Sequence, residues 1–151
     1  MNKELQEVFQ VRGNAIYSVT DDTTIKNAVD KMNIHNIGAL MVLTENGEVA
    51  GILSERDVMI KLAATDGLVG HLLVKEIMTK RENLIVIEGD ETVAEIMGIM
   101  TSKKIRHLPI VDTKGVLQGV ISMRDVFSIL LKDANQDIKD MKNYVMSNYP
   151  L

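Results

Sequence analysis

The sequence contains no cysteine and no tryptophan, and its aromatic residues are limited to 3 Tyr and 2 Phe. Without cysteine the chain has no disulfide, no thiol nucleophile and no thiolate metal ligand. So few aromatic side chains do not build the stacking surface on which single-stranded nucleic acid binds. We therefore expect a cytoplasmic protein whose function does not depend on thiol chemistry.

Long apolar runs and an excess of basic residues are missing as well. No run reaches the length that crosses a membrane, and the start, MNKELQEVFQVRG, is too polar for a signal peptide. The net charge of −4 argues against binding to duplex nucleic acid, which requires a basic surface. We expect neither membrane nor nucleic acid as a partner.

Motifs for catalysis and metal binding are also absent. The three histidines, His35, His71 and His107, lie far apart and do not have the spacing of metal ligands. The sequence contains neither a nucleophile elbow nor a glycine-rich phosphate loop. We therefore expect no metal site and no enzymatic activity.

The sequence does contain one short segment twice. GILSERDV begins at Gly51, and GVISMRDV begins at Gly119. At the same offset, residues 16–62 align with residues 84–130 without a gap. Repetition over this length indicates two structural units of one design.

Each unit has the pattern of a strand, a helix, a hairpin and a second helix. AIYSV and NLIVI are short apolar runs typical of strands, and apolar residues at helical spacing follow Asp22 and Asp90, which we expect to be N-caps. Gly47 and Gly115 lie in polar turns between apolar runs, which predicts hairpins. The predicted order is β-α-β-β-α, twice.

One such unit is too small to be stable alone, because three strands and two helices bury little apolar surface. The sequence therefore predicts an α+β fold with two units packed sheet to sheet and related by pseudo-two-fold symmetry. The expected domains are an N-terminal helix (1–12), the first repeat (13–75), the second repeat (76–134) and a C-terminal tail (135–151). Apolar spacing at Ile138, Met141 and Val145 indicates an amphipathic helix or a partner-binding segment in that tail.

Three further segments, VKEIMT, DETVAEIMGIM and KIRHLPIVD, accompany the duplicated motif. Together they make residues 13–133 resemble a tandem pair of CBS domains, the fold named after cystathionine β-synthase. The resemblance implies a regulatory module that binds an adenosine-containing ligand (AMP, ADP, ATP, NAD(H) or S-adenosylmethionine) between the repeats. It also implies a homodimer and a regulated partner protein. The alternative is a dimerisation scaffold without a functional ligand site.

The duplicated motif has chemistry that suits a nucleotide. Its polar residues are Ser54, Arg56 and Asp57 in the first unit and Ser122, Arg124 and Asp125 in the second. The serine lies where a strand becomes a helix, and the unpaired N–H groups at a helix N-terminus stabilise a phosphate. The aspartate can accept two hydrogen bonds from a ribose diol, and the arginine can pair with phosphate.

The same residues allow a purely structural interpretation. A serine followed three residues later by an acid is a capping box, in which each side chain bonds to the other residue's main-chain amide. A carboxylate that serves the cap in this way does not offer both oxygens to a ribose. The sequence leaves the two interpretations open.

Other candidates lie around the second hairpin. The resemblance places Arg106 and His107 in the ligand cleft, as contacts for phosphate or ribose, although a solvated helix end would also favour cations. Pro109 has no N–H to donate, which predicts that its strand lies at an edge or has that side turned to solvent. The corresponding residues of the first repeat are Gly38, Ala39 and Met41. We therefore expect the cleft of the first repeat to lack the cationic pair.

The remaining candidates are less specific. Lys80 lies beside the strand that opens the second repeat and is a candidate for a neighbouring cleft or for a solvated linker. The candidate walls for an adenine ring are Val19, Thr20, Ile37 and Met41 and their equivalents in the second repeat, Ile87, Glu88, Ile105 and Pro109. Each of these is also consistent with ordinary core packing.

Overall fold

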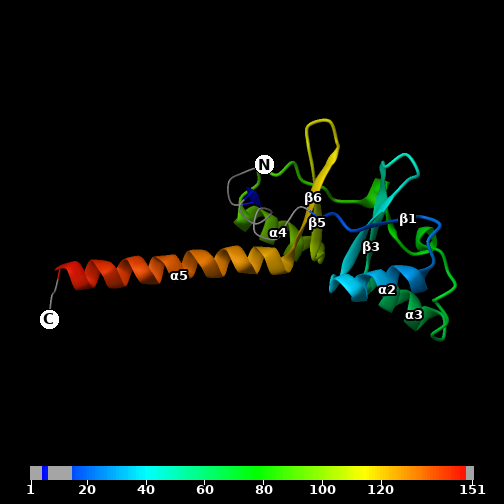
Figure 1. Ribbon diagram of the computed structural model, residues 1–151, viewed down its shortest axis with the longest axis horizontal. Helices are drawn as coiled ribbons and strands as arrows, with labels where there is room; N and C mark the ends of the chain where they lie inside the picture. Colours follow the sequence, from blue (N-terminus) through cyan, green and yellow to red (C-terminus); the bar gives the residue numbers. More distant parts are fainter. Residues whose placement is uncertain (1–4, 7–14, 149–151) are drawn as a thin grey trace.

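The computed structural model describes residues 5–6 and 15–148. It shows an α+β fold in which two repeats follow one another along the chain (Figure 1). The first repeat contains β1 (Ser18–Thr20), α2 (Ile25–His35), β2 (Ala39–Leu43), β3 (Val49–Ser54) and α3 (Glu55–Ala64). The predicted order β-α-β-β-α is therefore confirmed for this repeat.

The sheet of the first repeat has a fourth strand that the sequence did not indicate. β1 pairs parallel with β2, β2 pairs antiparallel with β3, and β3 pairs antiparallel with β4 (Thr79–Lys80). The chain reaches β4 after the 3-10 helix η1 (Val74–Glu76), so the segment between the repeats completes the first sheet.

The second repeat contains the 3-10 helix η2 (Arg81–Asn83), α4 (Val93–Lys103), β5 (His107–Val111), β6 (Leu117–Ser122) and α5 (Met123–Asn148). Its two named strands pair antiparallel. The strand predicted over residues 83–87 is wrong, since η2 occupies its start and only one isolated bridge, between Ile87 and Ile110, remains.

The missing strand has a physical cause in Pro109. In the first repeat the amide of Met41 donates to the carbonyl of Tyr17 at 3.0 Å, which extends the ladder of β1. Pro109 occupies the position that corresponds to Met41 and has no N–H to donate. The second ladder therefore stops at Ile87, whose amide donates to the Pro109 carbonyl at 3.0 Å.

The predicted N-caps, Asp22 and Asp90, are also wrong. The helices start two residues later, with Thr24 and Thr92 as N-caps. The hydroxyl of Thr24 accepts from the amide of Asn27, and that of Thr92 accepts from the amide of Glu95, each at 3.3 Å. Threonine is almost as good an N-cap residue as aspartate, so residue type did not distinguish the two candidates. The threonines are the caps because they directly precede the first helical residues.

Each repeat has its own hydrophobic core. Ile25, Leu40, Val42 and Leu53 are among the buried residues of the first, and Ile96, Met100, Leu108 and Ile121 are among those of the second. Leu5 is fully buried in the second core. The expected N-terminal helix otherwise lies outside the described residues.

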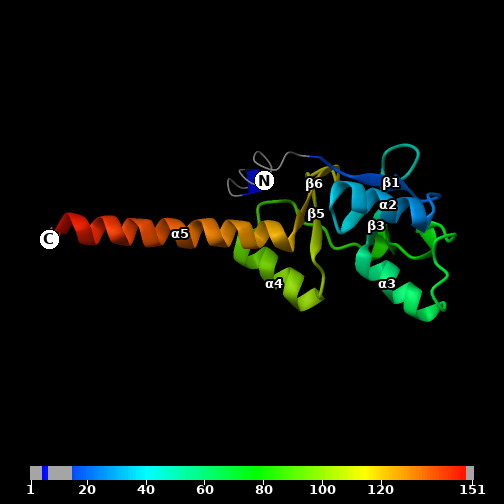
Figure 2. The same ribbon diagram turned by 60° about the horizontal axis from the view of Figure 1, so that its bottom comes forward.

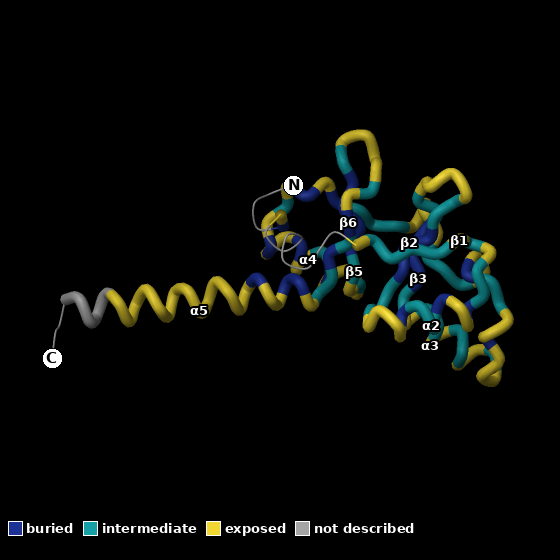
Figure 3. The backbone as a smooth tube through the Cα atoms, viewed as in Figure 1, coloured by how far each residue is buried: buried dark blue, intermediate teal, exposed yellow. Residues whose placement is uncertain are grey.

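α5 begins in the core of the second repeat and then leaves it. Val126 and Ile129 are buried, whereas every residue at 130–143 is exposed (Figure 3). The helix runs without interruption across the domain boundary expected at residue 134, and it projects away from both repeats (Figures 1 and 2). Of the helices in the described residues, none is both long and apolar enough to cross a membrane.

Candidate functional site

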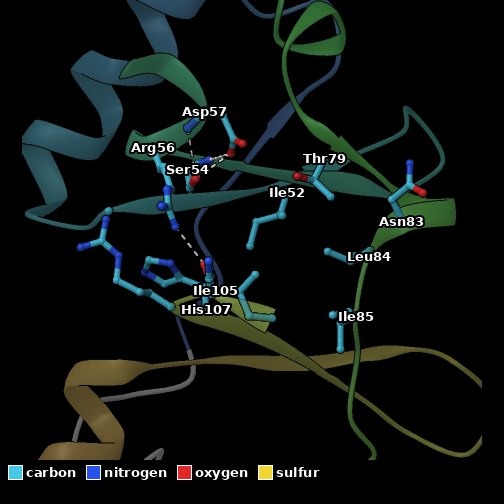
Figure 4. A pocket seen from close by; sticks show the side chains of 13 residues that line it. Ile52, Ser54, Arg56, Asp57, Thr79, Asn83, Leu84, Ile85, Ile105 and His107 are labelled. Carbon is cyan, nitrogen blue, oxygen red and sulfur yellow. Dashed lines mark hydrogen bonds between the residues drawn. The ribbon is translucent and has the colours of Figure 1, made fainter. Parts of the chain in front are cut away.

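A cavity of about 140 Å³ lies between the two repeats (Figure 4). One wall comes from β3 and the start of α3, and the opposite wall comes from the junction between α4 and β5. The lining residues used below are Ile52, Ser54, Arg56 and Asp57 from the first repeat and Ile105, Arg106 and His107 from the second. We call this cavity the first cleft.

The duplicated motif forms a capping box at the start of α3. The main-chain amide and the hydroxyl of Ser54 donate to Oδ2 of Asp57, at 2.8 and 2.6 Å, and the Asp57 amide donates back to the Ser54 hydroxyl at 3.4 Å. Ser122 and Asp125 repeat this arrangement at the start of α5, with distances of 2.7, 2.7 and 3.3 Å. In each motif one carboxylate oxygen, Oδ2, receives both capping bonds.

This geometry decides between the two interpretations for the structure as it stands. Both aspartates cap their own helices, and neither presents both oxygens to the cleft. A ribose that bonded to both oxygens of Asp57 would have to displace the bonds from Ser54. The capping role is therefore observed, and ribose recognition stays a prediction.

Arg56 bridges the two repeats. Its Nη1 donates to the main-chain carbonyl of Lys104 at 2.9 Å. Lys104 ends α4 in the left-handed conformation, with φ of 55°, and its amide bonds to the carbonyls of Met100 and Thr101. The turn at Lys104 leaves its carbonyl outside the helix ladder, where it accepts the guanidinium.

A second and wider cleft, of about 1030 Å³, lies at the equivalent place on the other side. Its lining includes Ser122, Arg124 and Asp125 from the second repeat and Asn36, Gly38 and Ala39 from the first. Each cleft thus joins the duplicated motif of one repeat to the helix–strand junction of the other.

This crossed construction corrects the expected place of the cationic pair. Arg106 and His107 line the first cleft, opposite the motif of the first repeat, so the expectation that this cleft lacks them is wrong. They also line the second cleft, and so do Gly38 and Ile52. These four residues form the boundary between the clefts.

The two clefts differ in charge. The lining of the first carries the basic residues Arg56, Lys104 and Arg106 against one acid, Asp57. That of the second carries Arg106 and Arg124 against two acids, Glu55 and Asp125. The first cleft is therefore the better site for an anionic group.

The other predicted site residues are placed as follows. Ile37 and Met41 line the second cleft, Ile105 lines the first, and Glu88 lines neither. Ile87 and Pro109 are buried, Val19 packs on the first core, and Thr20 is exposed. Lys80 lies in β4, opposite Gly51. These last five residues lie outside the lining of both clefts, so their proposed contacts stay predictions.

The sequence interpretation missed one edge of the first cleft, formed by Asn83, Leu84 and Ile85 (Figure 4). Their equivalents in the first repeat, residues 15–17, line the second cleft. The repeat itself was the signal that could have found them, because symmetric clefts require equivalent edges.

The main chain of β4 lies very close to Gly51. A Cβ added at Gly51 would lie 2.2 Å from the carbonyl oxygen of Thr79 in β4. Only glycine admits a neighbouring backbone at that distance. This contact fixes β4 beside Ile52 and therefore shapes the cleft floor.

Comparison with known proteins identifies two copies of one domain. The profile of the CBS domain matches residues 9–64 and 74–132. The CBS domain-containing protein CBSX3, mitochondrial, of Arabidopsis thaliana is 32% identical over 139 residues, which cover 91% of this chain. The match spans 66% of the length of that protein.

Solved structures give the same result. A CBS-domain containing protein from Agrobacterium tumefaciens superimposes with a TM-score of 0.77 at 31% identity, over 82% of this chain and 90% of its own. The CBS domain pair of protein MJ0100, solved with 5′-methylthioadenosine and S-adenosyl-L-methionine, gives a TM-score of 0.66 at 25% identity. That match covers 79% of this chain and 92% of the other.

Proposed function

The chain belongs to the CBS-domain family, and from this premise we propose that it is a regulatory module that binds an adenosine-containing ligand between its repeats. The observation that carries the proposal is the crossed first cleft, in which the N-terminus of α3 faces Arg106 and His107. The complex of MJ0100 with two adenosine compounds supports the ligand class.

The start of α3 is a suitable binding position for the phosphate or other polar end of the ligand. The first amides of a helix lack partners within the helix, and the helix dipole is positive there. Arg106 and His107 stand on the facing wall, so an anion at this point is held from both repeats. A ligand that bridges them would fix the relative position of the repeats.

The base has an apolar place between the repeats. Ile52, Ile85 and Ile105 surround the cavity with aliphatic side chains (Figure 4). Aliphatic walls with a few polar groups are typical of small-molecule sites. At about 140 Å³ the cavity is smaller than the roughly 300–1,000 Å³ of such sites. We therefore propose that the repeats part on binding and that Arg56 leaves the Lys104 carbonyl for the ligand.

The ribose contact has to respect the capping box. Oδ2 of Asp57 is engaged with Ser54, so we propose that the ribose meets the other oxygen, Oδ1, while the cap stays intact. A single hydrogen bond of this kind is weaker than a bidentate pair. The affinity for adenosine alone is then low, and the polar end of the ligand supplies much of the rest.

A scaffold without a ligand site is the second candidate. It is favoured by one observation, the engagement of both Asp57 and Asp125 in their caps. We also propose a homodimer in the cytoplasm for either function.

Thermal unfolding with AMP, ATP, NADH and S-adenosylmethionine tests the proposal. A ligand at a hundred times its Kd adds about 2.7 kcal/mol to the free energy of unfolding, which raises the Tm by several degrees. We expect such a shift with at least one of the four. Absence of any shift would favour the scaffold.

Two variants and a matched control assign the shift to a cleft. Asp57→Ala should clearly reduce the shift that comes from the first cleft, and Asp125→Ala that from the second. Thr92→Ala removes the capping box of α4. Because Thr92 lines neither of the two clefts, this variant should keep the full shift. If Thr92→Ala loses the shift as well, loss of a cap alone explains the result and the ribose role is wrong.

A further inference from the structure

The exposed part of α5 is a surface without a described covering. Residues 130–143 are all exposed and extend for about 21 Å beyond the second repeat. An isolated helix of this length is only marginally stable in water, because most helical stability comes from packing of an apolar face. A helix that projects in this way therefore needs a partner for one face.

The apolar residues of α5 are arranged in a single seam. We define the α5 seam as Phe127, Leu131, Ala134, Ile138 and Met141. Their spacing alternates between four and three residues, which is the heptad repeat of coiled coils. Phe127 is 55% exposed, Leu131 64%, Ile138 52% and Met141 72%. Large apolar side chains this exposed, in register along one helix, mark an interaction surface.

We propose that the α5 seam pairs in parallel with the α5 seam of a second copy of this chain, as a short two-stranded coiled coil. The proposal rests on the exposed face of α5, whose first two seam residues, Phe127 and Leu131, also line the second cleft. It goes beyond a homodimer as such, because it assigns the surface, the partner and the direction of pairing.

The charges beside the seam favour the parallel direction. Asp137 and Lys142 flank the seam on opposite sides, at the heptad positions called g and e. In a parallel pair each g residue lies beside the e residue five positions later on the other helix. Asp137 of each copy then meets Lys142 of the other, twice by symmetry. In an antiparallel pair, g residues lie beside g residues and e residues beside e residues. The Asp137 side of one helix then faces the Asp137 side of the other.

The outer face of the helix is polar and electrically balanced. Gln136 donates to Asp140 on that face at 2.9 Å. Lys132, Lys139 and Lys142 are matched in number by Asp133, Asp137 and Asp140 in the exposed part. With no positive excess, this helix has no electrostatic attraction to an anionic membrane surface. The balance favours a protein partner with the same seam.

The absence of cysteine allows a direct test with single-cysteine variants of the full chain. Ala134→Cys and Met141→Cys place one thiol on the seam, two helical turns apart, and Gln136→Cys places it on the outer face as the control. A disulfide requires Cα atoms roughly 4.4–6.8 Å apart. We expect both seam variants to become disulfide-linked dimers under mild oxidation and the control to stay largely monomeric on a non-reducing gel.

The pair of seam variants separates the possible results. In a parallel pair in register, a cysteine at position 134 or at position 141 lies beside the same cysteine of the other copy. In an antiparallel pair this is possible at only one of the two positions. Cross-linking of both seam variants but not of the control supports the proposal. Cross-linking at one level, at all three positions equally, or at none overturns it. The last result includes a seam that is covered by a different protein.

Charge reversal in the Met141→Cys chain adds a second readout. Asp137→Lys puts lysine against Lys142 of the other copy and should slow cross-linking several-fold, because two exposed pairs become repulsive. Adding Lys142→Asp should restore the rate. Within one helix Asp137→Lys gains Asp133 as a neighbour four residues away, so a helix effect would act in the opposite direction. An unchanged rate in the single reversal would contradict the parallel pairing.

Discussion

The guanidinium of Arg56 donates a hydrogen bond to the main-chain carbonyl of Lys104 and thereby joins α3 of the first repeat to the end of α4 in the second, at 2.9 Å. Both residues line the first cleft. The contact therefore closes the cleft by linking its two walls, and it relates the stability of the chain to the geometry of the site.

Loss of this contact should lower stability modestly. Arg56→Met keeps the length of the side chain and removes its donors, so we expect the free energy of unfolding to fall by about 1 kcal/mol. Because Arg56 is exposed, water replaces part of the lost hydrogen bond. Urea denaturation measures the change. Arg124→Met is the matched control, since no hydrogen bond among the described residues joins the side chain of Arg124 to Asn36. Equal losses in both variants would contradict the bridging role.

Gly51→Ala should be strongly destabilising. The new methyl group would lie 2.2 Å from the Thr79 carbonyl, so β3 and β4 must separate, at a cost of about 1–3 kcal/mol. Gly98→Ala is the control, because nothing lies within 4 Å of a Cβ there. Gly98 lies within α4, so alanine should stabilise that helix by up to about 1 kcal/mol. A Gly51→Ala chain as stable as the parent would show that β4 does not approach as described.

Stability should fall at acid pH through Glu95. Hydrogen bonds from the amide and then the hydroxyl of Thr92 lower the pKa of the Glu95 carboxyl from its usual 4.5. A carboxyl whose pKa is lower in the folded state stabilises the fold above its unfolded pKa, and this contribution is lost as the pH falls through the folded pKa. Urea midpoints between pH 6 and 3, compared with those of Glu95→Gln, measure the effect. The difference between the two chains should shrink toward the acid end, and a constant difference would be inconsistent with this linkage.

Binding of a phosphate-bearing ligand should depend on Arg106. Arg106→Gln removes a cation from the boundary of both clefts and should weaken ATP binding about tenfold, while adenosine binding stays nearly unchanged. Isothermal titration calorimetry with both ligands gives the comparison. Lys114→Gln, in the hairpin turn of the same repeat and outside both clefts, controls for net charge. An equal loss of ATP affinity in Lys114→Gln would show that the effect of Arg106 comes from net charge at long range and not from a contact in the cleft.

Much of the fold could be predicted because local signals and the repeat agreed. The turns at Gly47 and Gly115 are confirmed, with φ of 81° and 79°, since a tight hairpin needs a residue that adopts this conformation readily. The strand expected at residues 83–87 failed for a non-local reason. Its hydrogen-bonding partner is Pro109, and strand propensity in one segment carries no information about a missing donor in another.

The site could be predicted only in its components. Ser54 and Asp57 were identified from their spacing, but spacing does not reveal that their cleft is completed by Arg106 and His107 of the other repeat. That pairing depends on how two similar units are placed against each other, which the pattern within each unit does not specify. The capping box had the same limit, because the sequence allowed it and only geometry could show that Oδ2 of Asp57 accepts both capping bonds.

The position of α5 connects the second cleft with a point far outside both repeats. Asp125, Phe127 and Leu131, on the first turns of α5, line that cleft, while the far end of the same rigid rod lies well outside both repeats. A helix of 26 residues is about 39 Å long, so a tilt of about 10° at its base carries the tip through about 7 Å. A ligand in the second cleft that tilted α5 by this angle would therefore move its tip by a distance that another macromolecule can detect.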